Sequence, residues 1–233
     1  MPVLLAQGAY LRRTVRQLPD PAGDRSGYLG EGPDLRLLVI GDSSALGLGV
    51  DHQTQALLGQ LTARLSRYRR VTYDLVAVPG ARTGDVLGWV DDLPDERFDL
   101  VVTALGVNDV TKLVTLRQFR RRQIALVGAL KDRLGDPFVV VSGLPPVHQF
   151  PLLPKPLNWI LGQQARRFDR NLDHVANAHD RCAIVRPTIS LGLHNMAADG
   201  YHPGPTVYAE WAETILARLA RETDFLDAPG VSA

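Results

Sequence analysis

The sequence contains almost no cysteine. Cys182 is its single thiol among 233 residues, which excludes an internal disulfide. That residue opens the apolar run Cys182-Ala183-Ile184-Val185, so we expect it to pack in a buried strand.

The sequence also lacks an excess of charge of either sign. Lys and Arg number 26 against 25 Asp and Glu, and the net charge is +1. Binding of nucleic acid depends on clustered positive charge, so no nucleic-acid partner is predicted. The histidines show no metal-ligand spacing beyond the weak pair His174 and His179, so we expect no metal and no cofactor.

No long hydrophobic run opens the chain. The first residues, 1–7, carry a short apolar patch without a leading positive charge, too short for a secretory signal or a membrane span. We therefore expect a cytoplasmic protein with no integral membrane association, although a processed periplasmic form without its signal would look the same.

Glycine patterns of other enzyme classes are missing as well. Gly41, Gly47 and Gly49 match neither a dinucleotide fingerprint nor a Walker loop, which argues against a dehydrogenase or a kinase. The Gly-x-Ser-x-Gly elbow of α/β-hydrolases is absent too, because Ala45 occupies its last place.

Strand-like and helix-like segments alternate along the chain. Segments with helical periodicity include 53–68, 116–134 after the capping pattern Thr115-x-x-Gln118, and a last helix that starts at Pro205. This alternation predicts a parallel sheet covered on both faces. The expected strands are 35–40, 71–78, 100–105, 138–141 and 182–185.

The length and composition favour one domain over 35–225, preceded by a lead segment, 1–34, that packs on the domain or extends from it. A second irregular part is the stretch 143–157, which is rich in proline and is expected to form a long apolar loop. Its Phe150, Leu152 and Leu153 are candidates for a substrate pocket, with packing on the core as the alternative.

Three polar residues carry the chemistry. Ser43 follows the first predicted strand, in a turn that can expose its hydroxyl at the carboxyl edge of the sheet. A serine attacks only when a base removes its proton, and a carboxylate commonly orients that base. His202 and Asp199, three residues apart near the other end of the chain, fit these two roles.

Acyl transfer also needs donors for the oxyanion. The N–H of Ser43 is one candidate, and Gly80 and Asn108 follow two later strands at the same predicted edge. Asp42 and Asp109 are expected to tie their loops through backbone N–H groups instead of taking part in the reaction.

Four short blocks follow one another along the chain: Gly41-Asp42-Ser43, Gly80, Gly106-Val107-Asn108-Asp109 and Asp199-x-x-His202. In the order and spacing of these blocks, the chain resembles the SGNH subgroup of GDSL-type esterases and lipases over roughly residues 35 to 220. Ser44 stands where the family often has leucine.

The resemblance implies a fold, a reaction and a set of roles. The fold is a flavodoxin-like three-layer α/β/α sandwich with a central five-stranded parallel sheet. Ser43 is the nucleophile, His202 the base and Asp199 its orienter, while Ser43, Gly80 and Asn108 form the oxyanion hole. The implied enzyme is a serine esterase that acts on small-molecule esters with short to medium acyl chains.

Several alternatives use the same site. A thioesterase, a lysophospholipase, a carbohydrate deacetylase and an acyltransferase all begin with the same attack on an acyl carbon. A binding module on a hydrolase fold is the alternative from a different class, because a fold alone does not imply a function. The sequence gives no oligomeric state.

Overall fold

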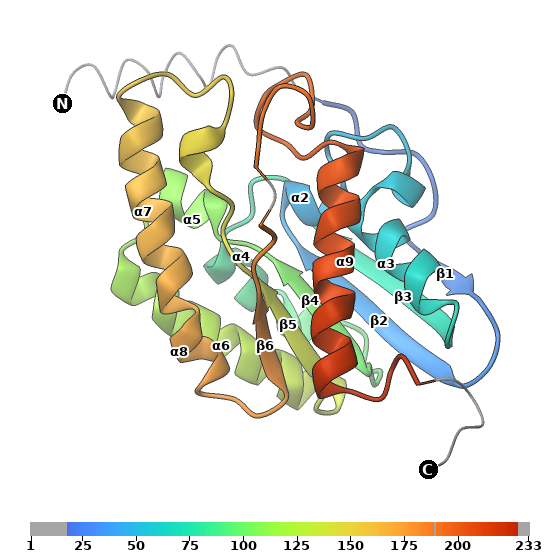
Figure 1. Cartoon of the computed structure of the whole chain (residues 1–233). Helices are drawn as coiled ribbons and strands as arrows, with labels where there is room; N and C mark the ends of the chain where they lie inside the picture. Colours follow the sequence, from blue (N-terminus) through green and yellow to red (C-terminus); the bar gives the residue numbers. More distant parts are fainter. Residues whose placement is uncertain (1–17, 189, 228–233) are drawn as a thin grey trace.

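A six-stranded sheet lies at the centre of the fold, between two layers of helices (Figure 1). The computed structural model describes residues 18–188 and 190–227, so the first half of the predicted lead segment 1–34, residues 1–17, lies outside the described residues. The strands are β1 (Ser26–Leu29), β2 (Asp34–Gly41), β3 (Arg70–Ala77), β4 (Leu100–Ala104), β5 (Phe138–Ser142) and β6 (Cys182–Val185).

The strand order is β1-β3-β2-β4-β5-β6, and all pairs except β1 with β3 are parallel. The five parallel strands therefore have the flavodoxin-like order. The chain passes from β2 to its neighbour β3 on one side, and then returns to add β4, β5 and β6 on the other side. This confirms the predicted fold class. In such sheets the crevice between the two directions, here at the ends of β2 and β4, is where ligands bind.

The sheet has one strand more than the five predicted, because β1 adds an antiparallel edge strand beside the five parallel ones. Its sequence gave no signal, since Tyr28 and Leu29 are exposed by 68% and 47% and no buried face imposes an alternating pattern. Pairing with β3 holds β1 in place, and the guanidinium of Arg70 lies over the Tyr28 ring.

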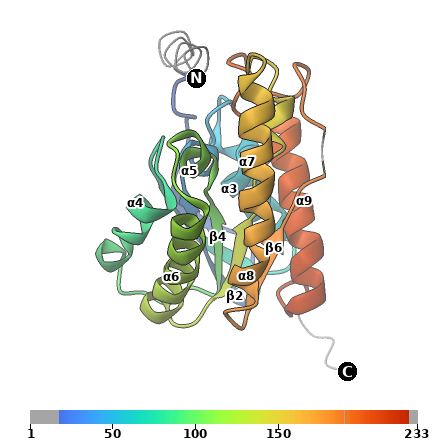
Figure 2. The same ribbon diagram turned by 90° about the vertical axis from the view of Figure 1, so that its left-hand side faces the viewer.

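Helices cover both faces of the sheet, and Figure 2 shows the three layers from the side. α3 and α9 contact each other on one face, while α6 contacts α4, α7 and α8 on the other. The helices are α2 (Ser43–Leu46), α3 (Leu57–Leu65), α4 (Thr83–Leu87), α5 (Val107–Thr111), α6 (Leu116–Leu134), α7 (Leu157–Asn171), α8 (Asp173–Ala176) and α9 (Pro205–Glu222). Short 3₁₀ turns occupy Gln53–Gln55, Val90–Asp92 and Val147–Gln149.

The strands alternate their side chains between two hydrophobic cores. On β2, Leu37 and Val39 pack towards α3 and α9, whereas Leu38 and Ile40 pack towards the helices of the opposite face. Both sets are buried, which explains why the central strands appear in the sequence as nearly continuous apolar runs.

Local signals determine where several helices begin. Thr115 and Gln118 cap α6 reciprocally, and Pro205 stands at the start of α9, both as predicted. The helix expected from residue 53 instead begins at Leu57, because Gln53–Gln55 form a separate 3₁₀ turn. The buried Gln53 side chain donates to the Leu46 carbonyl oxygen, a tertiary contact that holds this turn apart from α3.

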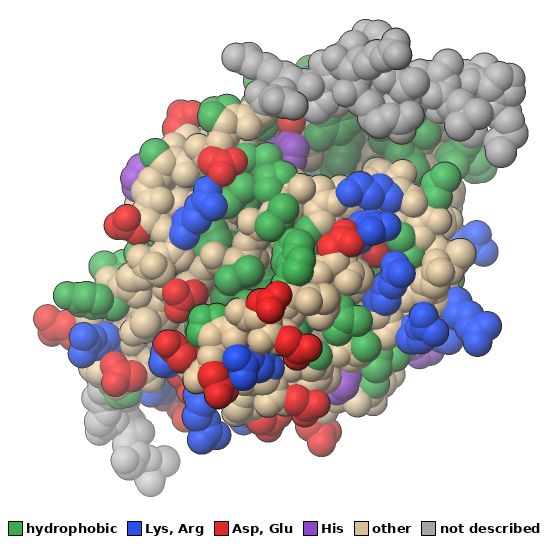
Figure 3. Space-filling view, turned by 180° about the vertical axis from the view of Figure 1, so that it is seen from behind, with side chains coloured by type: hydrophobic (Ala, Val, Ile, Leu, Met, Phe, Trp, Pro, Cys, Tyr) green, Lys and Arg blue, Asp and Glu red, His purple; other side chains and the backbone are tan. Residues whose placement is uncertain are grey.

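The face opposite to that of Figure 1 carries basic and acidic side chains among hydrophobic ones (Figure 3). This mixture agrees with the near-zero net charge of the chain.

Candidate active site

The candidate site lies where β2, β3 and β4 end side by side. Register pairs the last residue of β2, Gly41, with Ala77 and Ala104 at the ends of the two neighbouring strands. The segments that follow carry Ser43, the Pro79-Gly80 turn and Asn108. The fold therefore brings three separate stretches of sequence to one edge of the sheet.

Ser43 is the first residue of α2, directly after the turn that leaves β2. Gly41 permits this turn, since a Cβ there would lie 2.2 Å from the Ala104 carbonyl oxygen. Asp42 caps the helix by accepting from the Ser44 N–H at 2.9 Å, and the Ser44 hydroxyl donates to the same oxygen at 2.6 Å. The second hydroxyl of the motif is thus engaged by Asp42.

Ser43, His202 and Asp199 form a continuous chain of hydrogen bonds. His202 Nε2 lies 2.9 Å from Ser43 Oγ, and Nδ1 lies 2.5 Å from Asp199 Oδ2. A carboxylate at Nδ1 favours the tautomer with its proton there, which leaves Nε2 as the acceptor for the serine hydroxyl.

The environment of Asp199 keeps it ionised. The side chain is completely buried, and burial by itself raises its pKa. Hydrogen bonds from the His202 ring and from the N–H groups of Tyr201 and His202 outweigh this effect, so the net shift of the Asp199 pKa is downward. The carboxylate thus faces the imidazole as an anion.

The residues before and after the turn that carries Asp199 and His202 bond to each other and close the turn. An isolated β-bridge joins Met196 to Pro203, and the Ala197 N–H donates to the His202 carbonyl oxygen at 2.9 Å. Gly200 has a φ of +69°, which favours glycine at this point. These contacts fix the acid and the imidazole relative to each other.

Asn108, in the first turn of α5, is held by Asp42. Its Nδ2 donates to Asp42 Oδ2 at 2.9 Å, although the two residues are 66 positions apart. Burial raises the pKa of Asp42, and the hydrogen bonds from Ser44 and Asn108 together with the nearby His202 act in the opposite direction without cancelling it. One N–H of the Asn108 amide is thus committed to Asp42.

Gly80 lies in a β-turn with Pro79, closed by the Ala81 N–H on the Val78 carbonyl oxygen at 3.1 Å. Its φ of +81° is the conformation that a type II turn requires at this position. Lys112 Nζ donates to the Gly80 carbonyl oxygen at 2.5 Å. Within 18–188 and 190–227, the Gly80 N–H has no hydrogen-bond acceptor.

A buried polar cluster joins the Gly80 segment to the Asn108 segment. Asp109 Oδ2 accepts from the N–H and the hydroxyl of Thr83, at 3.0 and 2.9 Å, and Gln123 Nε2 donates to the same hydroxyl at 3.0 Å. All three side chains are buried, and burial raises the pKa of Asp109. Asp42 and Asp109 therefore bond to backbone N–H groups, as predicted.

A cavity of about 730 Å³ lies beside Ser43 and His202. Of the three residues predicted for a pocket, Phe150 and Leu153 line this cavity. Leu152 does not, and this part of the prediction is wrong. Leu152 is 50% exposed, and its side chain lies close to Gly200.

Sequence reasoning missed much of the cavity lining. Leu157, Ile160 and Leu161 of α7 contribute to it, as do Leu191 and Met196 from the segment before the His202 turn. The first three are spaced i, i+3 and i+4, a helical stripe that could have been read from the sequence.

The described residues include no group of three or more His, Cys, Asp or Glu side chains placed to hold a metal ion. Of the histidine pair noted in the sequence, His174 lies on α8 and His179 lies beyond its end. The Nε2 atom of His179 faces the Ile124 carbonyl oxygen at 2.9 Å.

The sequence matches the model of a known family. The sequence model of the GDSL-like lipase/acylhydrolase family matches residues 39–210, which include Ser43, Gly80, Asn108, Asp199 and His202. The chain belongs to this family. A search of curated proteins gives no match. No helix in 18–188 or 190–227 is both long and apolar enough to cross a membrane.

Solved structures share the fold at low sequence identity. TesA has a TM-score of 0.63 at 21% identity, covering 80% of this chain and 98% of that chain. The lipase Lip_vut3 from a goat rumen metagenome has a TM-score of 0.65 at 14% identity, with coverage of 82% and 99%. A family 3 carbohydrate esterase from Clostridium thermocellum has a TM-score of 0.61 at 14% identity, with coverage of 81% and 96%.

Proposed function

We propose that this member of the GDSL-like family hydrolyses carboxylic esters through an acyl-enzyme on Ser43. The observation that carries the proposal is the hydrogen-bonded chain from Ser43 Oγ through His202 to Asp199. A hydroxyl, an imidazole and a buried carboxylate in this order match the requirements of a serine nucleophile.

In the first half of the reaction, Ser43 Oγ attacks the acyl carbon and its proton passes to His202 Nε2. The ester C–O bond then breaks, and the leaving alcohol takes that proton. In the second half a water molecule attacks the acyl carbon with His202 again as the base, which releases the acid and restores the serine. Asp199 stabilises the imidazolium that forms in each half.

The oxyanion needs donors that are already oriented. Ser43 N–H, Gly80 N–H and the second amide proton of Asn108 are the candidates, from three segments at one sheet edge. Two observations support these candidates. The Gly80 N–H has no hydrogen-bond acceptor among the described residues, and Asp42 fixes the orientation of the Asn108 side chain.

Covalent labelling separates this enzyme from a non-catalytic binding module. An alkyl fluorophosphonate should add one phosphonyl group, and peptide mass spectrometry should map it to Ser43. Ser43→Ala should take no label, while Ser44→Ala, the matched control at the neighbouring hydroxyl, should still be labelled at Ser43. Absence of label on the folded wild-type protein would contradict a serine mechanism.

A further inference from the structure

The cavity beside Ser43 extends along the carboxyl edge of the sheet. Its lining includes Leu105 after β4, Ser142 at the end of β5 and Arg186 after β6. The sheet order places β6 three strand spacings from β2, or about 14 Å at a usual spacing of about 4.8 Å. The cavity therefore reaches from the nucleophile across three neighbouring strand ends.

The middle of the cavity is apolar. Val147, Phe150 and Leu153 come from the proline-rich loop, and Ile160 and Leu161 come from α7. The polar lining residues near the nucleophile lie within four positions of Ser43, Asn108 or His202 in the sequence, and the others, Ser142 and Arg186, lie at the strand ends beyond. A ligand in the middle of this cavity meets hydrocarbon.

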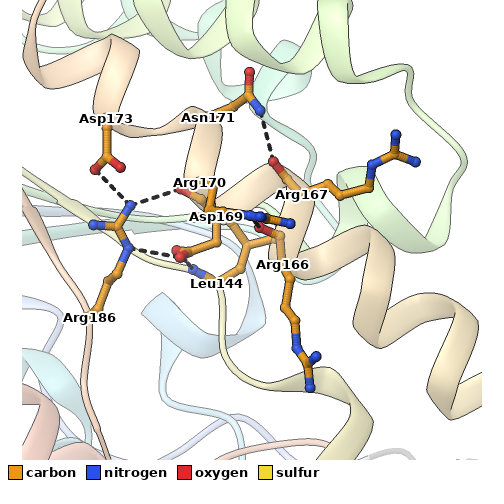
Figure 4. A network of polar contacts seen from close by, with 8 residues as sticks. All are labelled: Leu144, Arg166, Arg167, Asp169, Arg170, Asn171, Asp173 and Arg186. Carbon is orange, nitrogen blue, oxygen red and sulfur yellow. Dashed lines mark hydrogen bonds and ion pairs between the residues drawn. The ribbon is translucent and has the colours of Figure 1, made fainter.

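Both polar side chains at the far end form hydrogen bonds within the protein. The Ser142 hydroxyl accepts from Trp211 Nε1 at 3.2 Å. Arg186 donates from Nε to Asp169 Oδ2 at 2.8 Å and from Nη2 to Asp173 Oδ1 at 2.9 Å (Figure 4). In the apolar middle of the cavity, a sugar would lose water without gaining partners for its hydroxyls, whereas a hydrocarbon chain has no hydrogen bonds to lose.

The same ion pair fixes the wall of the cavity. Asp169 belongs to α7, and its Oδ1 accepts from the Leu144 N–H at 3.0 Å, at the start of the proline-rich loop (Figure 4). Gly143 allows this contact, because a Cβ there would lie 2.6 Å from Arg186 Cγ. The loop, α7 and the end of β6 are thus tied together, and the far end is closed by charged groups that do not favour hydrocarbon.

We infer that this cavity receives the acyl chain of the substrate and selects chains of about eight to twelve carbons. The inference rests on the proposed function and specifies its substrate class. A hydrocarbon chain advances about 1.25 Å per carbon, from bonds of about 1.52 Å and angles near 111°, so about 14 Å holds about eleven carbons. Longer chains would meet the Arg186 ion pair.

A p-nitrophenyl ester series from acetate to palmitate tests the inference. Each methylene that enters the cavity should raise kcat/KM by up to about fourfold, until the series reaches its maximum between octanoate and dodecanoate. Leu161→Trp should fill the cavity, lower kcat/KM for decanoate at least tenfold and move the maximum to shorter chains. Gln163→Trp, an exposed position on the same helix, should leave the profile unchanged.

The two proposals fail in different ways. Fastest hydrolysis of acetate, with a decline at every longer chain, would overturn the acyl-chain cavity and leave the serine esterase in place. If no ester is hydrolysed and Ser43 takes no phosphonate, the proposed function fails.

The cavity can still be tested by calorimetry, which measures the binding of decanoate. Ser43→Ala should bind decanoate, and the double variant Ser43→Ala with Leu161→Trp should not. No binding of decanoate would overturn the inference.

Discussion

Asn108 Nδ2 donates a hydrogen bond to Asp42 Oδ2, at 2.9 Å, and this bond joins the residue before the candidate nucleophile to a candidate oxyanion donor. Asp42 also accepts from the N–H and the hydroxyl of Ser44. One buried carboxylate thus fixes both the start of α2 and the side chain of Asn108. The nucleophile and the donor are positioned by the same group.

Asn108→Ala should lower kcat about a hundredfold or more with little change in KM, because a donor to the oxyanion acts mainly in the transition state. Steady-state kinetics on one ester measures both constants. A rise in KM at unchanged kcat would remove Asn108 from this role.

Asp42→Ala should also lower kcat, by a smaller factor, since Asn108 remains but is free to rotate. Ser44→Ala removes a different donor to the same carboxylate and should have a much smaller effect than Asp42→Ala. Equal losses in the two variants, with both folded by circular dichroism, would show that the bond to Asn108 has no special importance.

His202→Ala should cost more activity than Asp199→Ala. Serine hydrolases with this set of residues lose about 10⁶-fold in kcat without the base and about 10⁴-fold without the orienting acid. Hydrolysis rates of the two variants, each corrected for background, provide the comparison. A larger loss for Asp199→Ala would show that its buried carboxylate does more than orient the ring.

The sign of the Asp199 shift predicts its pH dependence. Because the pKa of Asp199 is lowered in the folded protein, its ionisation stabilises the fold above the pKa of the unfolded chain. That stabilisation is lost only as the pH falls through the lower folded pKa. Urea unfolding should therefore show that the wild type gains stability over Asp199→Asn as the pH rises from strongly acidic values to about 4, with a constant difference above that pH; a difference that does not depend on pH would contradict this.

Thr83→Val should destabilise the fold by about 1–3 kcal/mol, because the Thr83 hydroxyl bonds both Asp109 and Gln123 in a buried site. Urea unfolding should show a lower midpoint at an unchanged slope. Thr83→Ser keeps the hydroxyl and should retain most of the stability. A wild-type midpoint for Thr83→Val would mean that the cluster does not stabilise the fold.

Cys182 should react slowly at neutral pH. Burial raises the pKa of its thiol to about 11, against a smaller lowering by the nearby Lys131, and Glu222 raises it by less still. Alkylation by iodoacetamide should therefore accelerate about tenfold for each pH unit up to about pH 11. Urea-unfolded protein should react as an ordinary thiol, and equally fast alkylation of the folded protein at pH 7 would contradict this prediction.

The sequence predicted the central strands and the candidate site for the same physical reason. Strands buried on both faces appear as apolar runs, and in a parallel sheet the residues that follow them gather at one edge. Ser43, Gly80 and Asn108 could therefore be assigned to one edge of the sheet from the sequence alone. Asp199 and His202 were recognisable by their chemistry and spacing.

Features that depend on contacts distant in sequence were not predictable. β1 is an exposed strand held by pairing with β3, and the start of α3 depends on the Gln53 contact with Leu46. The loop that contains Leu152 has no periodicity, so nothing in the sequence tells which of its apolar side chains faces the cavity. The Asp42 contact with Asn108 arises only when β2 and β4 lie side by side.

The most direct test of the account is ester hydrolysis by the wild type and by Ser43→Ala, each first shown to be folded by circular dichroism. The account predicts that the wild-type protein turns over a p-nitrophenyl ester and that Ser43→Ala loses about 10⁶-fold in kcat. Undiminished turnover by Ser43→Ala would contradict the central claim, because the hydrolysis would then proceed without the nucleophile that the site provides.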